Sequence, residues 1–180
     1  MTTNEPSQNI EVEGHILGAL IKDVSHSKCR ETLDSLGDED FYSRVHRIVY
    51  RAIKALTEQK IHVDLVTLSE SLERNGDDFG GFIYLAELNR NTPGVYNLSA
   101  YVAIVKKHSQ LRKLALIVFN ANELINQGVE AAEIMDQLDC DLKNAAVSSS
   151  GAELRHIKQA EGDWLDRLQE RADRGGAISG

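Results

Sequence analysis

The residues in this chain that could do chemistry are one carboxylate–imidazole pair and two short acidic clusters. Glu11 and His15 lie four positions apart, so a helix would place them on one face, where both could bind one metal ion. A second pair of ligands at matching spacing is missing, which favours an ion pair on the surface. The acidic clusters at residues 38–40 and 77–78 are interpreted as helix caps and loop residues.

Sequence motifs for catalysis and nucleotide binding are absent from the 180 residues. There is no G-x-x-x-x-G-K-[ST] phosphate loop, no G-x-S-x-G and no H-E-x-x-H. The Gly80-Gly81 pair is too short to cradle a nucleotide and is interpreted as a sharp turn between helices. We therefore expect no catalytic residue, no metal site and no cofactor in this chain.

Cysteine usage and the N-terminal residues indicate the cellular compartment. Cys29 and Cys140 are far apart and neither belongs to a C-x-x-C pair, so we expect reduced thiols. The first residues lack the charged and apolar regions of a signal peptide, and no apolar run has the length of a membrane span. These features predict a soluble protein of the cytoplasm.

The charge balance argues against broad binding of nucleic acid. The formal net charge is −8, whereas contact with a phosphate backbone needs clustered positive charge. One row of basic residues recurs at helical spacing, and it is interpreted as a solvated helix face rather than a phosphate-binding stripe. This row comprises Arg44, Arg47, Arg51 and Lys54.

Hydrophobic periodicity predicts an all-α fold, because no alternating run of useful length is bounded by turns. Asn9, Ser43 (or Asp40) and Asp64 are expected to cap helices. In the helix expected at 82–90, the inward residues are expected to be Phe82, Leu85, Ala86 and Leu88. Gly14 and Gly18 share one helix face and would permit another backbone to approach closely.

The expected organisation is a compact helical globule followed by a long helical hairpin and a separate linker helix. The segments are a disordered tail at 1–8, the globule at 9–98, the hairpin at 99–147, a hinge at 148–152, the linker helix at 153–174 and a flexible end at 175–180. The hinge is inferred from its serine and glycine content.

The first arm of the expected hairpin carries too many apolar side chains for one buried face. Residues 114–119 are all apolar, so a helix here exposes apolar side chains in several directions. The segment 130–147 can cover one side, and the second cover must come from the rest of the chain or from another chain. Both a central core helix and a dimerising hairpin remain open. The candidate interface residues are Leu116, Ile117, Phe119, Ile134, Met135 and Leu138.

Several stretches, taken together and in order, resemble the bacterial replicative DNA helicases of the DnaB type. The resemblance covers roughly residues 9–115, and its specificity lies in the ordered combination rather than in one motif. The stretches that carry it include Asn9 to Glu13, Ile16 to Leu20, Asp40 to Tyr42, His46-Arg47, Val63 to Leu65, Gly80-Gly81, Tyr84-Leu85 and Thr92-Pro93.

This resemblance implies the N-terminal collar domain of a hexameric helicase, in which hairpins from two subunits pack together and three dimers build a ring. It implies primase as a partner, a helicase loader as a further candidate, and contact with DNA chiefly through the whole ring. The segment 153–174 corresponds by position to the linker helix that docks on a neighbouring motor domain, with Trp164, Leu165 and Leu168 as its anchors.

The same resemblance implies that this chain itself has no ATPase or helicase activity. ATP and magnesium would belong to a motor domain that follows the flexible end, and the parent protein would be an ATP-dependent DNA helicase. The sequence departs from the family pattern near Gly14 and His15, and the segment between Asn75 and Gly80 is short.

Two alternative functions remain. One is a stand-alone regulator or decoy that imitates the helicase domain and modulates assembly of the ring. The other is a DNA-binding module that uses the basic residues at the start of the long helix, which are Lys106, Lys107, Arg112 and Lys113.

Overall fold

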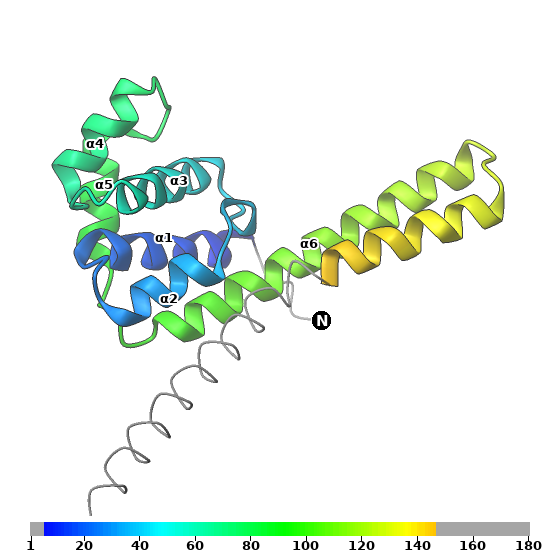
Figure 1. Ribbon diagram of the computed structural model, residues 1–180, viewed down its shortest axis with the longest axis horizontal. Helices are drawn as coiled ribbons and strands as arrows, with labels where there is room; N and C mark the ends of the chain where they lie inside the picture. Colours follow the sequence, from blue (N-terminus) through cyan, green and yellow to red (C-terminus); the bar gives the residue numbers. More distant parts are fainter. Residues whose placement is uncertain (1–5, 147–180) are drawn as a thin grey trace, which may run out of the picture. The chain divides into compact units, whose positions relative to one another are not determined.

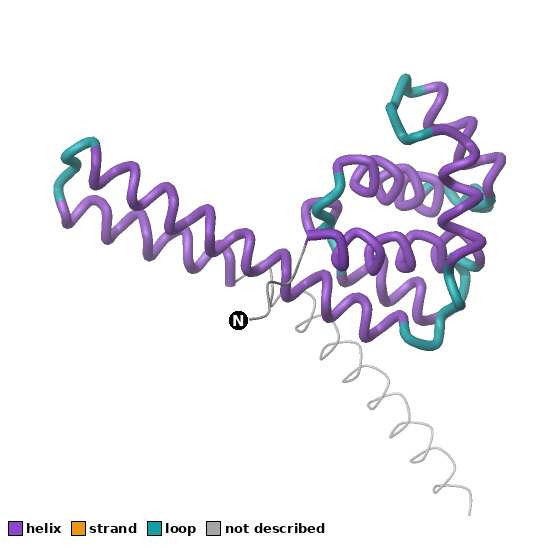
Figure 2. Tube along the Cα trace, turned by 180° about the vertical axis from the view of Figure 1, so that it is seen from behind, coloured by secondary structure: helices purple, strands orange, loops and turns teal. Residues whose placement is uncertain are grey.

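The computed structural model describes residues 6–146, and within them every regular element is a helix. Figure 2 shows helices joined by turns and loops, and no strand occurs in this part of the chain. The expectation of an all-α fold is confirmed. The predicted hinge, linker helix and flexible end, with Trp164, Leu165 and Leu168, lie outside the described residues.

The chain divides into two compact units, the first ending at Phe119 and the second beginning at Asn120. The helices are α1 (Pro6–Lys22), α2 (Ser27–Ser35), η1 (Asp38–Asp40), α3 (Arg44–Glu58), α4 (Leu65–Arg74), α5 (Gly81–Asn91) and α6 (Leu98–Asn126), and residues 131–146 are also helical. In the second unit the chain turns at Gly128, where φ is +75°, between the end of α6 and the 131–146 helix (Figure 1).

Helix α1 is central to the first unit, where it packs against both α3 and α5. It begins at Pro6, a residue that suits the first helical position because it needs no backbone N–H donor there. The predicted cap at Asn9 is therefore wrong, since residues 6–9 already belong to the helix. Of the predicted tail at 1–8, residues 6–8 are helical and the rest lie outside the described residues. Its buried side chains include Ile16, Leu17 and Leu20, which are fully inaccessible.

Two predicted caps hold the starts of their helices. The Ser43 hydroxyl accepts a hydrogen bond from the His46 amide at the start of α3. The Asp64 carboxylate accepts from the amides of Val66 and Thr67 at the start of α4. Each cap satisfies amide groups that have no partner within the helix, which fixes where the helix begins.

Close packing of α1 on α5 depends on Gly18. A Cβ atom added there would lie 2.2 Å from the Leu88 carbonyl oxygen and 2.0 Å from the Thr92 hydroxyl oxygen. The predicted close approach of another backbone is thus confirmed, with α5 as the partner. Helix α5 presents Leu85 and Leu88 to the core, whereas Phe82 is 46% exposed, so its predicted inward position is wrong. Because the buried face of α5 follows residues 84, 85 and 88, Tyr84 turns inward instead of Phe82.

Candidate functional site

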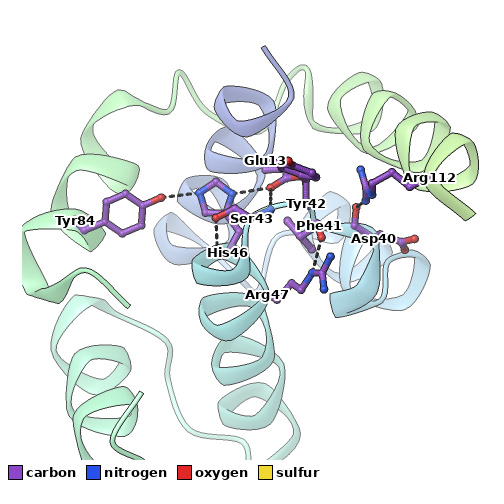
Figure 3. Close-up of polar contacts among 9 residues, drawn as sticks. All are labelled: Glu13, Asp40, Phe41, Tyr42, Ser43, His46, Arg47, Tyr84 and Arg112. Carbon is purple, nitrogen blue, oxygen red and sulfur yellow. Dashed lines mark hydrogen bonds and ion pairs between the residues drawn. The ribbon is translucent and has the colours of Figure 1, made fainter. Parts of the chain in front are cut away.

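A fully buried carboxylate, Glu13 of α1, lies at the centre of a polar network in the first unit (Figure 3). Its Oε1 accepts a hydrogen bond from the Tyr42 amide at 2.5 Å, and its Oε2 accepts from the Ser43 amide at 3.2 Å. The Oε2 atom also lies 2.8 Å from Nδ1 of His46, which is 1% exposed. Buried carboxylates are costly unless paired and hydrogen-bonded, and Glu13 meets both conditions.

His46 extends the network from α3 to α5. Its Nε2 lies 2.6 Å from the Tyr84 hydroxyl, so the ring joins a carboxylate on one side to a phenol on the other. When Glu13 is ionised it can only accept hydrogen bonds, so the Nδ1–H group of His46 donates to it. In the neutral imidazole, Nε2 then accepts a hydrogen bond from the Tyr84 hydroxyl. Burial, followed by the nearby carboxylates of Glu13 and Glu87, raises the pKa of Tyr84.

Tyr84 and His46 also line an open cleft of about 340 Å³ between α1 and α5. The cleft has an apolar part around Ile10 and Leu88, and two carboxylate residues, Glu11 and Glu87, border it. The complete lining comprises Ile10, Glu11, Gly14, His15, His46, Tyr84, Glu87, Leu88 and Asn91. An apolar surface bordered by negative charge suits a partner that offers apolar and cationic side chains together.

The Glu11–His15 pair, which could have been part of a metal site, lies at this cleft. His15 Nε2 is 3.9 Å from Glu11 Oε1, and the imidazole stacks on Tyr101 of α6 with ring centroids 5.5 Å apart. Among residues 6–146, no group of three or more potential ligands could hold a metal ion. Glu11 and His15 thus lie within ion-pair distance of each other, and the imidazole also makes a stacking contact.

On the side away from the cleft, the short turn from Asp40 to Ser43 contacts the first half of α6. The Asp40 carboxylate accepts from the Ser109 hydroxyl at 2.6 Å, and its carbonyl accepts from the Arg112 guanidinium at 2.5 Å. That guanidinium also lies over the Tyr42 ring, 5.8 Å from its centroid. The turn thus binds α6 through polar contacts (Figure 3).

The two basic patches singled out in the sequence are partly used inside the fold. In the α3 row, Arg47 donates to the Phe41 carbonyl and Arg51 pairs with Asp38 at 2.5 Å. In the α6 patch, Arg112 donates to Asp40 and Lys113 lies 3.9 Å from the same residue's carboxylate. Because these side chains engage groups of their own chain, both patches offer less free positive charge than the sequence suggested.

The predicted interface residues fall into two groups by exposure. Leu116 and Phe119 are each 60% exposed, and Met135 is 71% exposed. Ile117 and Ile134 are buried, and Leu138 is partly buried. Half of the predicted set is therefore available to another chain, while the rest is covered within this one.

The Glu13–His46–Tyr84 network was not identified as a site from the sequence. A signal was present, because Glu13 falls three residues after Ile10 and four before Leu17, on the apolar side of α1. His46 likewise falls on the buried side of α3, three residues before Val49. A charged or titratable residue inside an apolar stripe indicates a buried partner, but periodicity cannot name the partner.

No described helix combines the length and apolar content needed to cross a membrane.

The chain is 36% identical over 128 residues to the replicative DNA helicase DnaB of Buchnera aphidicola subsp. Baizongia pistaciae, covering 70% of this chain and 27% of that protein. It is 34% identical over 142 residues to the DnaB helicase of Pasteurella multocida, covering 74% of this chain and 29% of that protein. The chain thus spans less than a third of the length of these curated relatives.

Solved structures show the same fold. The N-terminal domain of the DnaB helicase from Mycobacterium tuberculosis aligns with a TM-score of 0.69 and 28% identity, covering 78% of this chain and 99% of that one. A DnaB-like replicative helicase, described with its interactions with primase, aligns with a TM-score of 0.60 and 19% identity, covering 84% of this chain and 36% of that one. Residues 5–107, more than half of the chain, match the family described as DnaB-like helicase N terminal domain, and the chain belongs to that family.

Proposed function

We propose that this chain is the non-catalytic collar domain of a hexameric replicative helicase, which holds subunits together and offers a docking surface to primase. Membership of the DnaB-like N-terminal family supports the assignment. A longer protein containing this domain would be an ATP-dependent DNA helicase of the cytoplasm. The purified 180-residue chain is expected to hydrolyse no ATP, and turnover that persists through repeated purification would contradict this.

The observation that carries the assembly role is the exposure of apolar side chains on α6. Leu116 and Phe119 are three positions apart, and Val118, 67% exposed, lies between them. Successive helical residues point about 100° apart, so these side chains cover more than one face. Large exposed apolar surfaces mark protein interfaces. A second copy of the chain is the occupant that the family resemblance implies.

In this proposal Leu116, Phe119 and Met135 make the contact between two chains. Ile117 and Ile134 are buried within their own chain, and Leu138 is partly buried. In the full-length protein, three such dimers would form the hexameric collar.

The assembly role is tested by the double substitution Leu116→Glu and Phe119→Glu. Charges on this surface should abolish self-association in sedimentation velocity, because desolvating two carboxylates without partners opposes the contact. Circular dichroism should show unchanged helix content, since both side chains are exposed.

A matched control for this test is Ile83→Glu. This substitution adds a carboxylate at a residue of α5 that is 75% exposed and lies outside the proposed interface. It should leave the association unchanged. Loss of helix in the double variant, or dissociation caused equally by the control, would show that the α6 surface is not the interface.

The α1–α5 cleft is our proposed docking surface for primase, with a helicase loader as a further candidate. A structurally similar DnaB-like replicative helicase has been described with its interactions with primase. Here, an apolar cleft bordered by Glu11 and Glu87 offers both shape and charge complementarity to a basic amphipathic segment. Such a contact needs no catalytic group, in keeping with the absence of catalytic motifs.

Docking is tested by reversing the charge of the cleft with Glu11→Lys and Glu87→Lys. The double variant should bind the cognate primase C-terminal domain at least about tenfold more weakly in calorimetry, because paired interfacial charges typically contribute 1.5 kcal/mol or more. Glu31→Lys together with Glu58→Lys makes the same change in net charge at exposed residues of α2 and α3 and should bind normally. Equal weakening by both pairs would indicate a general charge effect and not a docking cleft.

A further inference from the structure

A set of hydrogen bonds runs from the α1–α5 cleft to the turn at residues 40–43, and Asp40 of the same turn contacts helix α6. It starts at the Tyr84 hydroxyl in the cleft, passes through the His46 ring, and reaches the carboxylate of Glu13. From Glu13 it continues to the backbone amides of Tyr42 and Ser43. Figure 3 shows these groups pointing toward one another from α1, α3, α5 and the turn before α3.

The central part of this set has little freedom to rearrange. Glu13 is 0% exposed and His46 is 1% exposed, so the protein supplies the hydrogen-bond partners of both side chains in the folded chain. Removing one partner of a buried charged group leaves the rest of the network with an unsatisfied donor or acceptor, which is costly. A change at Tyr84 is therefore expected to alter the hydrogen bonds between Glu13 and the two amides.

The turn whose amides donate to Glu13 also contacts α6. Asp40, two residues before Tyr42, binds both Ser109 and Arg112, and the Tyr42 ring lies under the Arg112 guanidinium. Ser109 is 2% exposed and is the last residue of α6 before Ile117 to be buried. The same four residues thus carry contacts toward the cleft on one side and toward α6 on the other.

We propose that the Asp40–Ser43 turn couples the α1–α5 cleft to the first half of α6, with Glu13 and His46 as positioning residues. A ligand that draws the Tyr84 hydroxyl away from His46 loosens the hold of Glu13 on the turn, and with it the contacts of Asp40 to α6. By reciprocity, a change at Ser109 or Arg112 alters the environment of His46 and Tyr84. The regulatory meaning rests on the proposed docking at the cleft, whereas the coupling itself needs no partner.

The test uses Tyr84→Phe, which removes one hydroxyl and keeps the ring. Amide hydrogen exchange of the full chain is measured without any partner. The Tyr42 and Ser43 amides should exchange about threefold to tenfold faster, the factor expected when one hydrogen bond is weakened, and residues 109–113 should follow. Faster exchange confined to α5, or to residues 42–43, would overturn the proposal.

A reciprocal variant and a matched control complete the experiment. Ser109→Ala should shift the ¹⁵N resonances of the His46 ring, and unchanged resonances would also overturn the coupling. Ser69→Ala removes another buried hydroxyl, which donates to Glu73 within α4, and should leave residues 42–43, residues 109–113 and His46 unchanged. Primase that fails to bind the chain would refute the docking site and leave this measurement intact.

Discussion

The polar network around Glu13 and the exposed surface of α6 at residues 114–119 differ in which kind of side chain is buried and which is left exposed. Glu13 carries a carboxylate, which is costly to bury, yet it is fully buried and its hydrogen-bond partners belong to the same chain. On α6, side chains that favour burial remain exposed, Phe119 at 60% among them. The polar groups of the first region find their partners in a single copy, whereas covering the second by another molecule is what the proposed assembly requires.

The difference shows that composition alone does not tell core from interface. A carboxylate is usually a surface residue and a phenylalanine usually a core residue. In the proposed assembly the apolar surface makes the contact between chains, because burying it against a second copy would release water from both surfaces. The polar network instead fixes the geometry of α1, α3 and α5 and the turn before α3.

The largest effect that would test this comparison is expected for Glu13→Ala. The substitution leaves His46 and two backbone amides without their acceptor in a buried site, so the free energy of unfolding should fall by about 3 to 5 kcal/mol. Urea denaturation monitored by circular dichroism measures it. Glu11→Ala, two residues away on the exposed side of α1, should change stability by no more than about 0.5 kcal/mol. Similar losses for the two variants would show that the network is not specially important.

A second effect contrasts the two cysteines. Burial, with a smaller contribution from the charge of Asp23, raises the pKa of Cys29 to about 11, whereas Cys140 is exposed on the 131–146 helix. At pH 8 Cys29 should react with iodoacetamide at least about a hundredfold more slowly, because the thiolate is the nucleophile and its fraction is small. Mass mapping of the modified peptides gives both rates. Comparable rates would indicate that the globule opens readily.

The smallest effect concerns the cap of α4. Hydrogen bonds from the backbone of Thr67, and then from its side chain and from Val66, lower the pKa of Asp64 below its usual value of 3.8. A group with a lowered folded-state pKa stabilises the protein above the unfolded value and loses that contribution as the pH falls through the lowered one. Asp64→Asn should therefore flatten the pH dependence of the melting temperature below about pH 4 and change it little at pH 7. An unchanged acid profile would show that the cap contributes nothing through its charge.

Local features of the fold were predictable where one helix face decides the outcome. The stripe through Val49, Ile53 and Leu56 predicted α3, and Ser43 and Asp64 predicted two helix starts, because capping depends only on neighbouring residues. The position of Phe82 was predicted wrongly. It is apolar, but the buried face of α5 is set by contact with α1, and that face includes Tyr84 instead.

The sequence by itself determined the helical class, most helix positions and the family resemblance, since these depend on residue order and local periodicity. Only the tertiary structure decided that Glu13 meets His46, 33 positions away, and that His46 also contacts Tyr84 on a third helix. It also decided which residues of the apolar run in α6 are covered, with Ile117 buried and Leu116 exposed. Both outcomes depend on how the helices pack against one another. The periodicity of one helix shows which of its faces is apolar, but it does not specify which other helix covers that face.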